Sequence, residues 1–130
     1  MGEPIEVILL RQWSSYLELP VWIMDSSGTL IFYNEAAEAI LGRRFEDSGA
    51  IELAELDSLF VTTAEDGSAL ASDEIPIGIA LLHHAPAHRR IRFTGLDRVS
   101  RLIDVTAFPI SGHGGRQLGA VAMFWEVKPA

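Results

Sequence analysis

The sequence predicts a segregated α+β fold, in which an antiparallel sheet carries helices on one face. A short strand pair at residues 21–33 leads directly into a capped helix, three further strands fill the last third of the chain, and the helical patterns lie between these two groups. Strands that cluster in this way, rather than alternating with single helices, are typical of antiparallel sheets. The order of elements is therefore β-β-α-α-α-β-β-β.

Residues 4–17 have the periodicity of an amphipathic helix. One stripe at helical spacing contains Ile5, Ile8, Leu9, Trp13, Tyr16 and Leu17. Pro4 suits a first helical position, and Pro20 restricts the residue before it and ends the helix. We expect an N-terminal helical segment, residues 1–18, followed by one main domain, residues 19–130.

The strand pair begins with Val21–Asp25, turns at Ser26, Ser27 and Gly28, and continues through residues 29–33. Asn34 follows at the position of a helix N-cap, where its side chain can accept a bond from an early helical N–H. Glu35–Leu41 is rich in alanine and glutamate, and Gly42 provides a C-terminal stop. The segment therefore predicts a hairpin that feeds a capped helix.

The middle of the chain predicts a short helix within residues 51–60 and a longer one from Pro76 to about His84. The last third predicts strands at residues 88–94, 100–110 and 117–127. The glycine-rich loop of residues 111–116 joins the last two strands, and because a strand follows it, we interpret it as a hairpin turn and not as a phosphate loop.

Composition restricts the class of function. The chain has 130 residues, which suffices for one domain with a real core, and no apolar run long enough for a transmembrane helix. A signal peptide is not visible, so we expect a cytoplasmic protein without a membrane partner. The net charge of −8 argues against nucleic acid as a partner. The absence of cysteine excludes disulfides, thiolate metal sites and flavin photochemistry through a cysteine adduct.

Four stretches in this order resemble the PAS domains, over roughly residues 15–127. They are residues 19–28 as the opening strand and turn, residues 31–37 as the second strand with its capping Asn34, residues 66–67 and 74–81 as the turn and long helix, and residues 108–110 and 118–124 as the final hairpin. One departure is the Asp-Ile-Thr signature that often ends this family, which is replaced here by Glu126-Val127-Lys128.

The resemblance implies a five-stranded antiparallel sheet curled around a small cavity. Members of this family bind haem, flavin, small acids or fatty acids, or nothing, and many form dimers. We therefore expect a sensory or regulatory domain that binds a small, hydrophobic ligand and acts through association. An output domain or partner protein outside this chain fits this interpretation. The alternative is a ligand-free interaction module, and the weaker one is a small enzyme.

We expect an apolar cavity lining suited to a hydrophobic ligand. The predicted lining residues are Ile23, Phe32, Leu41, Leu59, Ile79, Leu82, Phe93, Thr106 and Phe124. Some haem-binding members place their axial histidine on the long helix, where His83 and His84 lie, so haem is a weak candidate cofactor. No histidine cluster has metal-ligand spacing, and no residue pattern predicts a catalytic site, so we expect neither a metal nor an enzymatic activity.

The last strand is apolar on both faces from Leu118 to Trp125, whereas a strand with one solvent face alternates with polar residues. Something must therefore cover the second face of the sheet, and the N-terminal helix of this chain or of a partner is the obvious candidate. The sequence thus predicts a homodimer. Its predicted interface residues are Ile5, Ile8, Leu9, Trp13, Tyr16, Val121, Met123 and Trp125.

Overall fold

A single twisted sheet organises the chain in the computed structural model, which describes residues 4–127 apart from the side chains of residues 53, 54 and 57. Residues 1–3 and 128–130 lie outside the described residues. They contain the start of the predicted N-terminal segment 1–18, the end of the predicted domain 19–130, and Lys128 of the altered family signature. The six antiparallel strands run in the order β2-β1-β6-β5-β4-β3. Their bounds are Val21–Asp25 (β1), Leu30–Tyr33 (β2), Val61–Thr63 (β3), Ala87–Thr94 (β4), Ser100–Ser111 (β5) and Gln117–Glu126 (β6).

The predicted α+β class is confirmed, with one strand more than expected. The sixth strand is β3, three residues long, which pairs with β4 at the edge of the sheet. The strand Val21–Asp25 and the helix Glu35–Leu41 have the predicted bounds. Because β3 is so short, its residues give too little alternation to stand out in the sequence.

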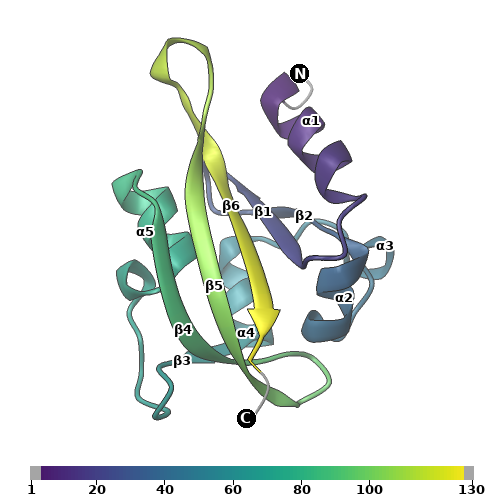
Figure 1. Ribbon diagram of the computed structural model, residues 1–130, viewed down its shortest axis with the longest axis vertical. Helices are drawn as coiled ribbons and strands as arrows, with labels where there is room; N and C mark the ends of the chain where they lie inside the picture. The colour runs from purple at the N-terminus through teal and green to yellow at the C-terminus, as the bar shows by residue number, and fades with distance from the viewer. Residues whose placement is uncertain (1–3, 128–130) are drawn as a thin grey trace.

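Helices lie on both faces of the sheet (Figure 1). On the inner face lie α2 (Glu35–Leu41), α3 (Phe45–Ser48), α4 (Leu53–Leu59) and α5 (Pro76–His83), with the 3₁₀ turn η1 (Ser72–Glu74) before α5. A second 3₁₀ turn, η2 (His113–Gly115), lies at the tip of the long β5–β6 hairpin. The N-terminal helix α1 (Ile5–Ser14) packs against the opposite, outer face. No helix within residues 4–127 is long and apolar enough to cross a bilayer.

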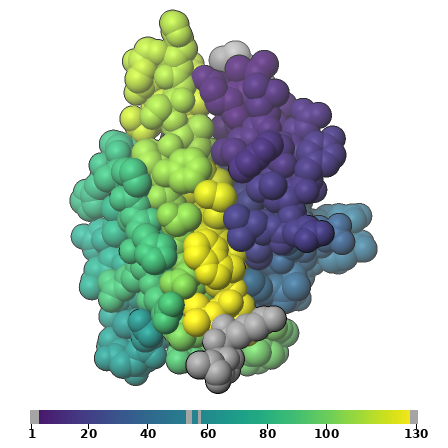
Figure 2. Space-filling view, viewed as in Figure 1, coloured from purple at the N-terminus to yellow at the C-terminus, as the bar shows by residue number. Residues whose placement is uncertain are grey.

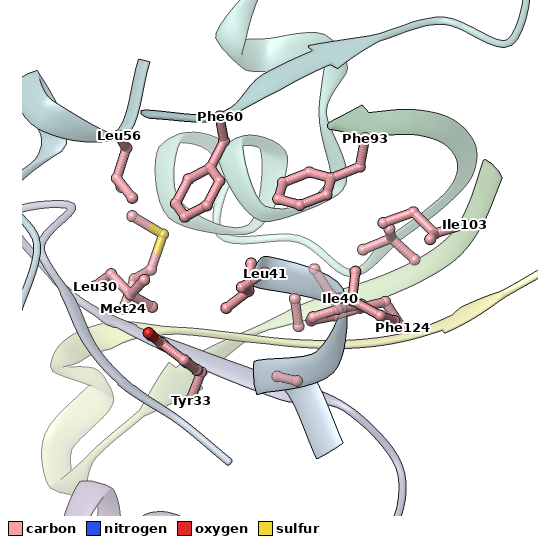
Figure 3. Close-up of a cluster of buried hydrophobic side chains, with 14 of the residues drawn as sticks. Met24, Leu30, Tyr33, Ile40, Leu41, Leu56, Phe60, Phe93, Ile103 and Phe124 are labelled. Carbon is pink, nitrogen blue, oxygen red and sulfur yellow. The ribbon is translucent and has the colours of Figure 1, made fainter. Parts of the chain in front are cut away.

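Each face of the sheet has its own apolar cluster. The inner cluster joins the sheet to α2, α4 and α5 and contains Leu30, Leu41, Phe60, Phe93 and Phe124, which Figure 3 shows converging from different elements. The outer cluster lies beneath α1 and comprises Val7, Val21, Ile23, Ile110, Leu118 and Val121. The sheet is therefore buried on both sides over β1 and β6, as the apolar last strand predicts.

The face of α1 that packs on the sheet differs from the predicted stripe. Val7 and Ser14 are fully buried and Leu10 packs beside them, whereas Ile8 and Trp13 are 46% and 52% exposed. Polar contacts accompany this orientation of α1 about its own axis. Arg11 donates to Ile31 O at 3.1 Å and lies 5.2 Å over the ring of Phe32. Several of the larger apolar side chains of α1 thus lie on its exposed side. Figure 2 shows α1, in purple, lying beside β6, in yellow, on this face of the molecule.

Asn34 is the polar centre of this arrangement, and only 2% of it is exposed. Its Oδ1 accepts the Ala37 N–H at 3.1 Å, which confirms the predicted N-cap, and also the Val21 N–H at 3.0 Å. Its Nδ2 donates to Ser14 O at 2.9 Å and Leu19 O at 2.8 Å. One side chain therefore connects α1, β1 and α2.

A bulge in β6 moves Leu118 to the outer face. The β5–β6 register shifts after Ile110 pairs with Gly119, and Gly119 has φ +145°. A Cβ at Gly119 would lie 2.0 Å from Met24 O on the neighbouring strand, so only glycine fits there. Strict alternation, which assigns Leu118 to the same face as Ala120, is therefore wrong at this residue.

Candidate functional site

An apolar cavity lies between the inner face of the sheet and the helices that cover it. Its volume is ≈ 530 Å³, within the range of pockets that hold small organic molecules. Val61, Ala71 and Ser72 belong to the lining and are exposed, so they mark the side on which the cavity opens to solvent.

Five of the six strands, together with helices and loops of the inner layer, contribute to the wall. The sheet provides Trp22 and Met24 from β1, Val61 and Thr62 from β3, Ile91 and Phe93 from β4, Ile103 and Val105 from β5, and Ala122 and Phe124 from β6. The helices and loops provide Leu41, Leu56, Phe60, Leu70, Ala71, Ser72, Ile75, Ile77, Gly78 and Leu81. Phe60 and Phe93 form an aromatic pair in this wall, with ring centroids 5.3 Å apart (Figure 3). No lining residue carries a charge.

The close packing of η1 on α5 brings several lining residues together. A Cβ at Gly78 would lie 1.8 Å from Ser72 O, so the absence of a side chain lets the two segments touch. Pro76 occupies the first turn of α5 as predicted and is buried. This contact holds Ser72 and Ile75 beside Ile77 and Gly78 in the lining.

Three of the predicted lining residues, Leu41, Phe93 and Phe124, line this cavity. The structure places Ile23, Phe32 and Thr106 on the outer face instead. Ile23 and Phe32 belong to the outer cluster, and Thr106 alternates with Val105 and Ala107 of the inner one. A one-residue error in choosing the buried face of a strand moves a side chain to the other side of the sheet.

The remaining three predicted residues lie on helices at the inner face but outside the lining. Leu59 is half-buried against the inner cluster, and Leu82 is 58% exposed. Ile79 is half-buried on α5, whereas its neighbours Gly78 and Leu81 contribute to the wall. The predicted phase of α5 was therefore rotated by about one residue, which is 100° on a helix.

The cavity does not fit haem ligation through the long helix. His83 and His84 are both exposed at the end of α5, and no histidine belongs to the lining. His84 itself adopts a left-handed conformation with φ +52°, where it ends the helix. Among the described residues, no three His, Asp or Glu side chains come together as a metal site.

One polar group in the cavity wall stands out. The indole Nε1 of Trp22 is buried and finds no hydrogen-bond acceptor among the described residues. Trp22 lies on β1 opposite Ala122 and packs against Phe60, with ring centroids 6.0 Å apart. Sequence reasoning placed the neighbouring Ile23 in the lining and missed Trp22. Alternation puts these two residues on opposite faces of β1 but does not show which face points inward.

The outer face combines apolar residues with one ionic cluster. Of the predicted interface residues, Ile5 and Leu9 on α1 and Tyr16 just after it are also exposed, while Val121 is 1% exposed beneath the helix. Val121 is therefore not available to a partner, because α1 of the same chain already covers it. Met123 is half-buried, and Trp125 is 41% exposed near the end of β6.

Asp104 lies on this outer face next to Trp125. It accepts two bonds from Arg90, at 3.3 and 3.2 Å, and its Oδ1 lies 3.6 Å from His88 Nε2. The carboxylate of Asp104 raises the pKa of the Arg90 guanidinium. Arg90 lies directly opposite Asp104 on the neighbouring strand β4, where cross-strand pairs of opposite charge meet.

Comparison with known proteins gives the fold a name. No protein-family model and no curated protein matches the sequence. Solved structures do match. A PAS domain from Colwellia psychrerythraea is 17% identical, with a TM-score of 0.67 over 93% of this chain and 96% of that chain.

Two further structures extend the likeness. The PAS domain of the fruit-fly ELK potassium channel is 8% identical, with a TM-score of 0.71 over 93% of this chain and 96% of that chain. A Rhodobacter sphaeroides LOV protein is 12% identical, with a TM-score of 0.73 over 96% of this chain and 69% of that chain. The chain therefore has the fold of PAS and LOV domains over nearly its whole length.

Proposed function

We propose that this PAS-fold chain is a sensory or regulatory domain that binds a small, uncharged and mainly apolar molecule in its inner cavity. The observation that carries this proposal is the partly open cavity of ≈ 530 Å³ with an uncharged wall. Well-packed interiors contain few voids larger than a water molecule, so a space of this size in a small domain favours an occupant. Burial of a hydrophobic ligand there would contribute in proportion to the apolar area removed from water.

Strand β6 offers the path from the cavity to the surface. Its residues Ala122 and Phe124 line the cavity, whereas the alternating residues Val121 and Met123 contact the outer cluster under α1. A ligand that shifts β6 therefore changes the packing of α1 directly. In this mechanism the ligand selects one of two positions of α1, and association with a partner reads that position.

Native mass spectrometry of freshly purified protein tests the ligand. We expect a retained mass that Ala122→Leu removes, because the added side chain occupies the cavity at a residue that is 4% exposed. Thr106→Leu is the matched control, since it adds an apolar side chain to the other face of the neighbouring strand. A clean apo mass, together with no uptake of apolar probes by the wild type, would contradict ligand binding.

The second candidate function is a ligand-free association module, and the exposed α1 surface favours it. Five apolar side chains on α1 and just after it are between 46% and 79% exposed and form what we call the α1 stripe, namely Ile5, Ile8, Leu9, Trp13 and Tyr16. Contiguous exposed apolar patches usually mark interfaces. We propose that this α1 stripe, continued by Trp125, forms the homodimer interface under either function.

Light scattering coupled to size exclusion tests the dimer. Trp13→Asp places a charge in the centre of the stripe and should give a monomer, whereas Ser15→Asp adds the same charge at the C-cap outside the stripe and should not. A wild-type monomer at high concentration would contradict the proposed interface. An intact dimer whose cavity is empty and takes up no apolar probe would favour the association module over the sensor.

A further inference from the structure

Three aromatic side chains form one continuous group in the wall of the cavity. Phe60 packs against both other members, with its ring centroid 6.0 Å from that of Trp22 and 5.3 Å from that of Phe93. All three residues belong to the lining, together with Phe124 of β6. Trp22 lies on β1, Phe93 on β4, and Phe60 links α4 to β3, so the fold brings rings from distant segments together. Figure 3 shows the rings of Phe60 and Phe93 extending into the middle of the inner cluster, on the side of Leu41.

A ligand in the cavity can touch only carbon on these three side chains. Phe60 and Phe93 keep 7% and 6% of their surface exposed, and Trp22 is half-buried although its indole nitrogen is buried. The rings are tilted, by 59° between Trp22 and Phe60 and by 30° between Phe60 and Phe93. An aromatic ligand can meet tilted rings in the edge-to-face and offset arrangements that ring pairs prefer, which contribute beyond the area they bury. An aliphatic molecule of the same size gains from its buried area alone.

The polar groups of the wall restrict the ligand further. Among the described residues of the lining, none is charged and only Thr62 and Ser72 carry a hydroxyl group. Thr62 follows the exposed Val61 and Ser72 is itself exposed, so both lie at the open side of the cavity. A heteroaromatic molecule with polar groups around its whole edge would therefore bury several of them without a side-chain partner, which is unfavourable. The wall thus fits an aromatic molecule whose few polar groups lie at the opening.

We infer that the cavity selects an uncharged aromatic molecule with few polar groups over an aliphatic molecule of the same size. This inference rests on the proposed ligand-binding function and specifies its ligand class. It assigns Phe60, which contacts both other rings, as a residue that determines specificity. The aliphatic part of the wall supplies affinity for any apolar molecule that fits, and the group of rings discriminates in favour of the aromatic one.

A matched pair of probes separates these contributions. 2-Naphthylmethanol and its fully hydrogenated form share one carbon skeleton and one hydroxyl group, and they differ in the aromatic rings. Calorimetric dissociation constants are compared between the wild type and Phe60→Leu, which keeps an apolar side chain and removes the ring. We expect Phe60→Leu to weaken the aromatic probe about two- to tenfold more than the hydrogenated probe, the range of one aromatic pair. Phe108→Leu is the matched control, because Phe108 lies opposite Val121 on the outer face, and it should weaken neither probe.

A second readout on the wild type keeps the test decisive if Phe60→Leu does not fold. Nuclear Overhauser contacts of bound 2-naphthylmethanol should join its ring protons to the ring protons of Phe60 and Phe93. Equal weakening of both probes by a folded Phe60→Leu, or contacts of the naphthyl protons with aliphatic side chains alone, would overturn the inference while leaving the ligand-binding function in place. Failure of both probes to bind the wild type would overturn both.

Discussion

Replacing Asn34 by alanine should destabilise the domain more than any other exchange of a polar side chain. Four hydrogen bonds shorter than 3.5 Å are lost, together with a longer one from Asn34 Nδ2 to Leu17 O at 3.5 Å. Two of the groups keep second partners: the Ala37 N–H also donates to Asn34 O at 3.0 Å, and Ser14 O also accepts the Leu17 N–H at 3.1 Å. The Val21 N–H and Leu19 O keep none among the described residues. The Val21 N–H is buried and costs about 1–3 kcal/mol when unpaired, the part-buried Leu19 O costs at most about 1 kcal/mol, and the lost cap adds about 1 kcal/mol. We expect a loss of about 2–5 kcal/mol in the free energy of unfolding.

Urea denaturation followed by circular dichroism measures this loss. Asn34→Asp tests the two halves of the side chain, because aspartate keeps both acceptor bonds and loses both donor bonds. It should still be strongly destabilised, since its carboxylate would face Ser14 O and Leu19 O without a proton to donate. Asp66→Ala is the control: Asp66 also accepts two bonds, from Ser68 N and Oγ, but in an exposed turn where water replaces them. A loss below about 1 kcal/mol for both Asn34 variants would refute the account of Asn34 as the connection between α1, β1 and α2.

Two further outcomes follow from the backbone and from a buried phenol. Gly119→Ala should prevent stable folding, because the new Cβ would meet Met24 O at 2.0 Å. Gly115→Ala, with φ +77° and open space around it, should cost only about 1 kcal/mol of left-handed strain. Thermal unfolding of the two variants measures this difference. Burial raises the pKa of Tyr33 above its ordinary value of 10.0. The protonated phenol is favoured in the folded state, so its contribution is complete below pH 10 and is lost as the pH rises through the folded pKa. Ultraviolet titration of a Tyr16→Phe variant should show this late ionisation, and an ordinary pKa would contradict the burial of Tyr33.

The sequence predicted the elements with strong local chemistry and failed where tertiary contacts choose between equivalent faces. Asn34 and Gly42 bound α2 because a cap and a left-handed stop act through neighbouring residues. The four-residue helix α3 was missed because Arg44 gives it no side-chain cap. It is held instead by the bond from Phe45 N–H to Glu38 on α2, a partner that no local pattern reveals.

The sequence predicted that the candidate site is an apolar cavity, but it predicted only some of the residues that line it. An apolar cavity follows from the fold, but its lining depends on which side of each strand faces inward. For β1, both Val21 and Ile23 on one side and Trp22 and Met24 on the other are apolar, so alternation gives no polar marker. Periodicity on α1 had the same weakness, because Val7, Leu10 and the buried Ser14, with the half-buried Arg11, face the sheet in place of most of the larger apolar side chains.

The double burial of β6 also limits how its sequence can vary. From Leu118 to Phe124 every residue except Met123 is buried, and the exception packs against the outer cluster. A strand with one solvent face accepts polar replacements at every second residue, as β4 does at His88 and Arg90. β6 has no such permissive positions until Trp125, so we expect a saturation library to show a continuous intolerant block there and an alternating pattern along β4.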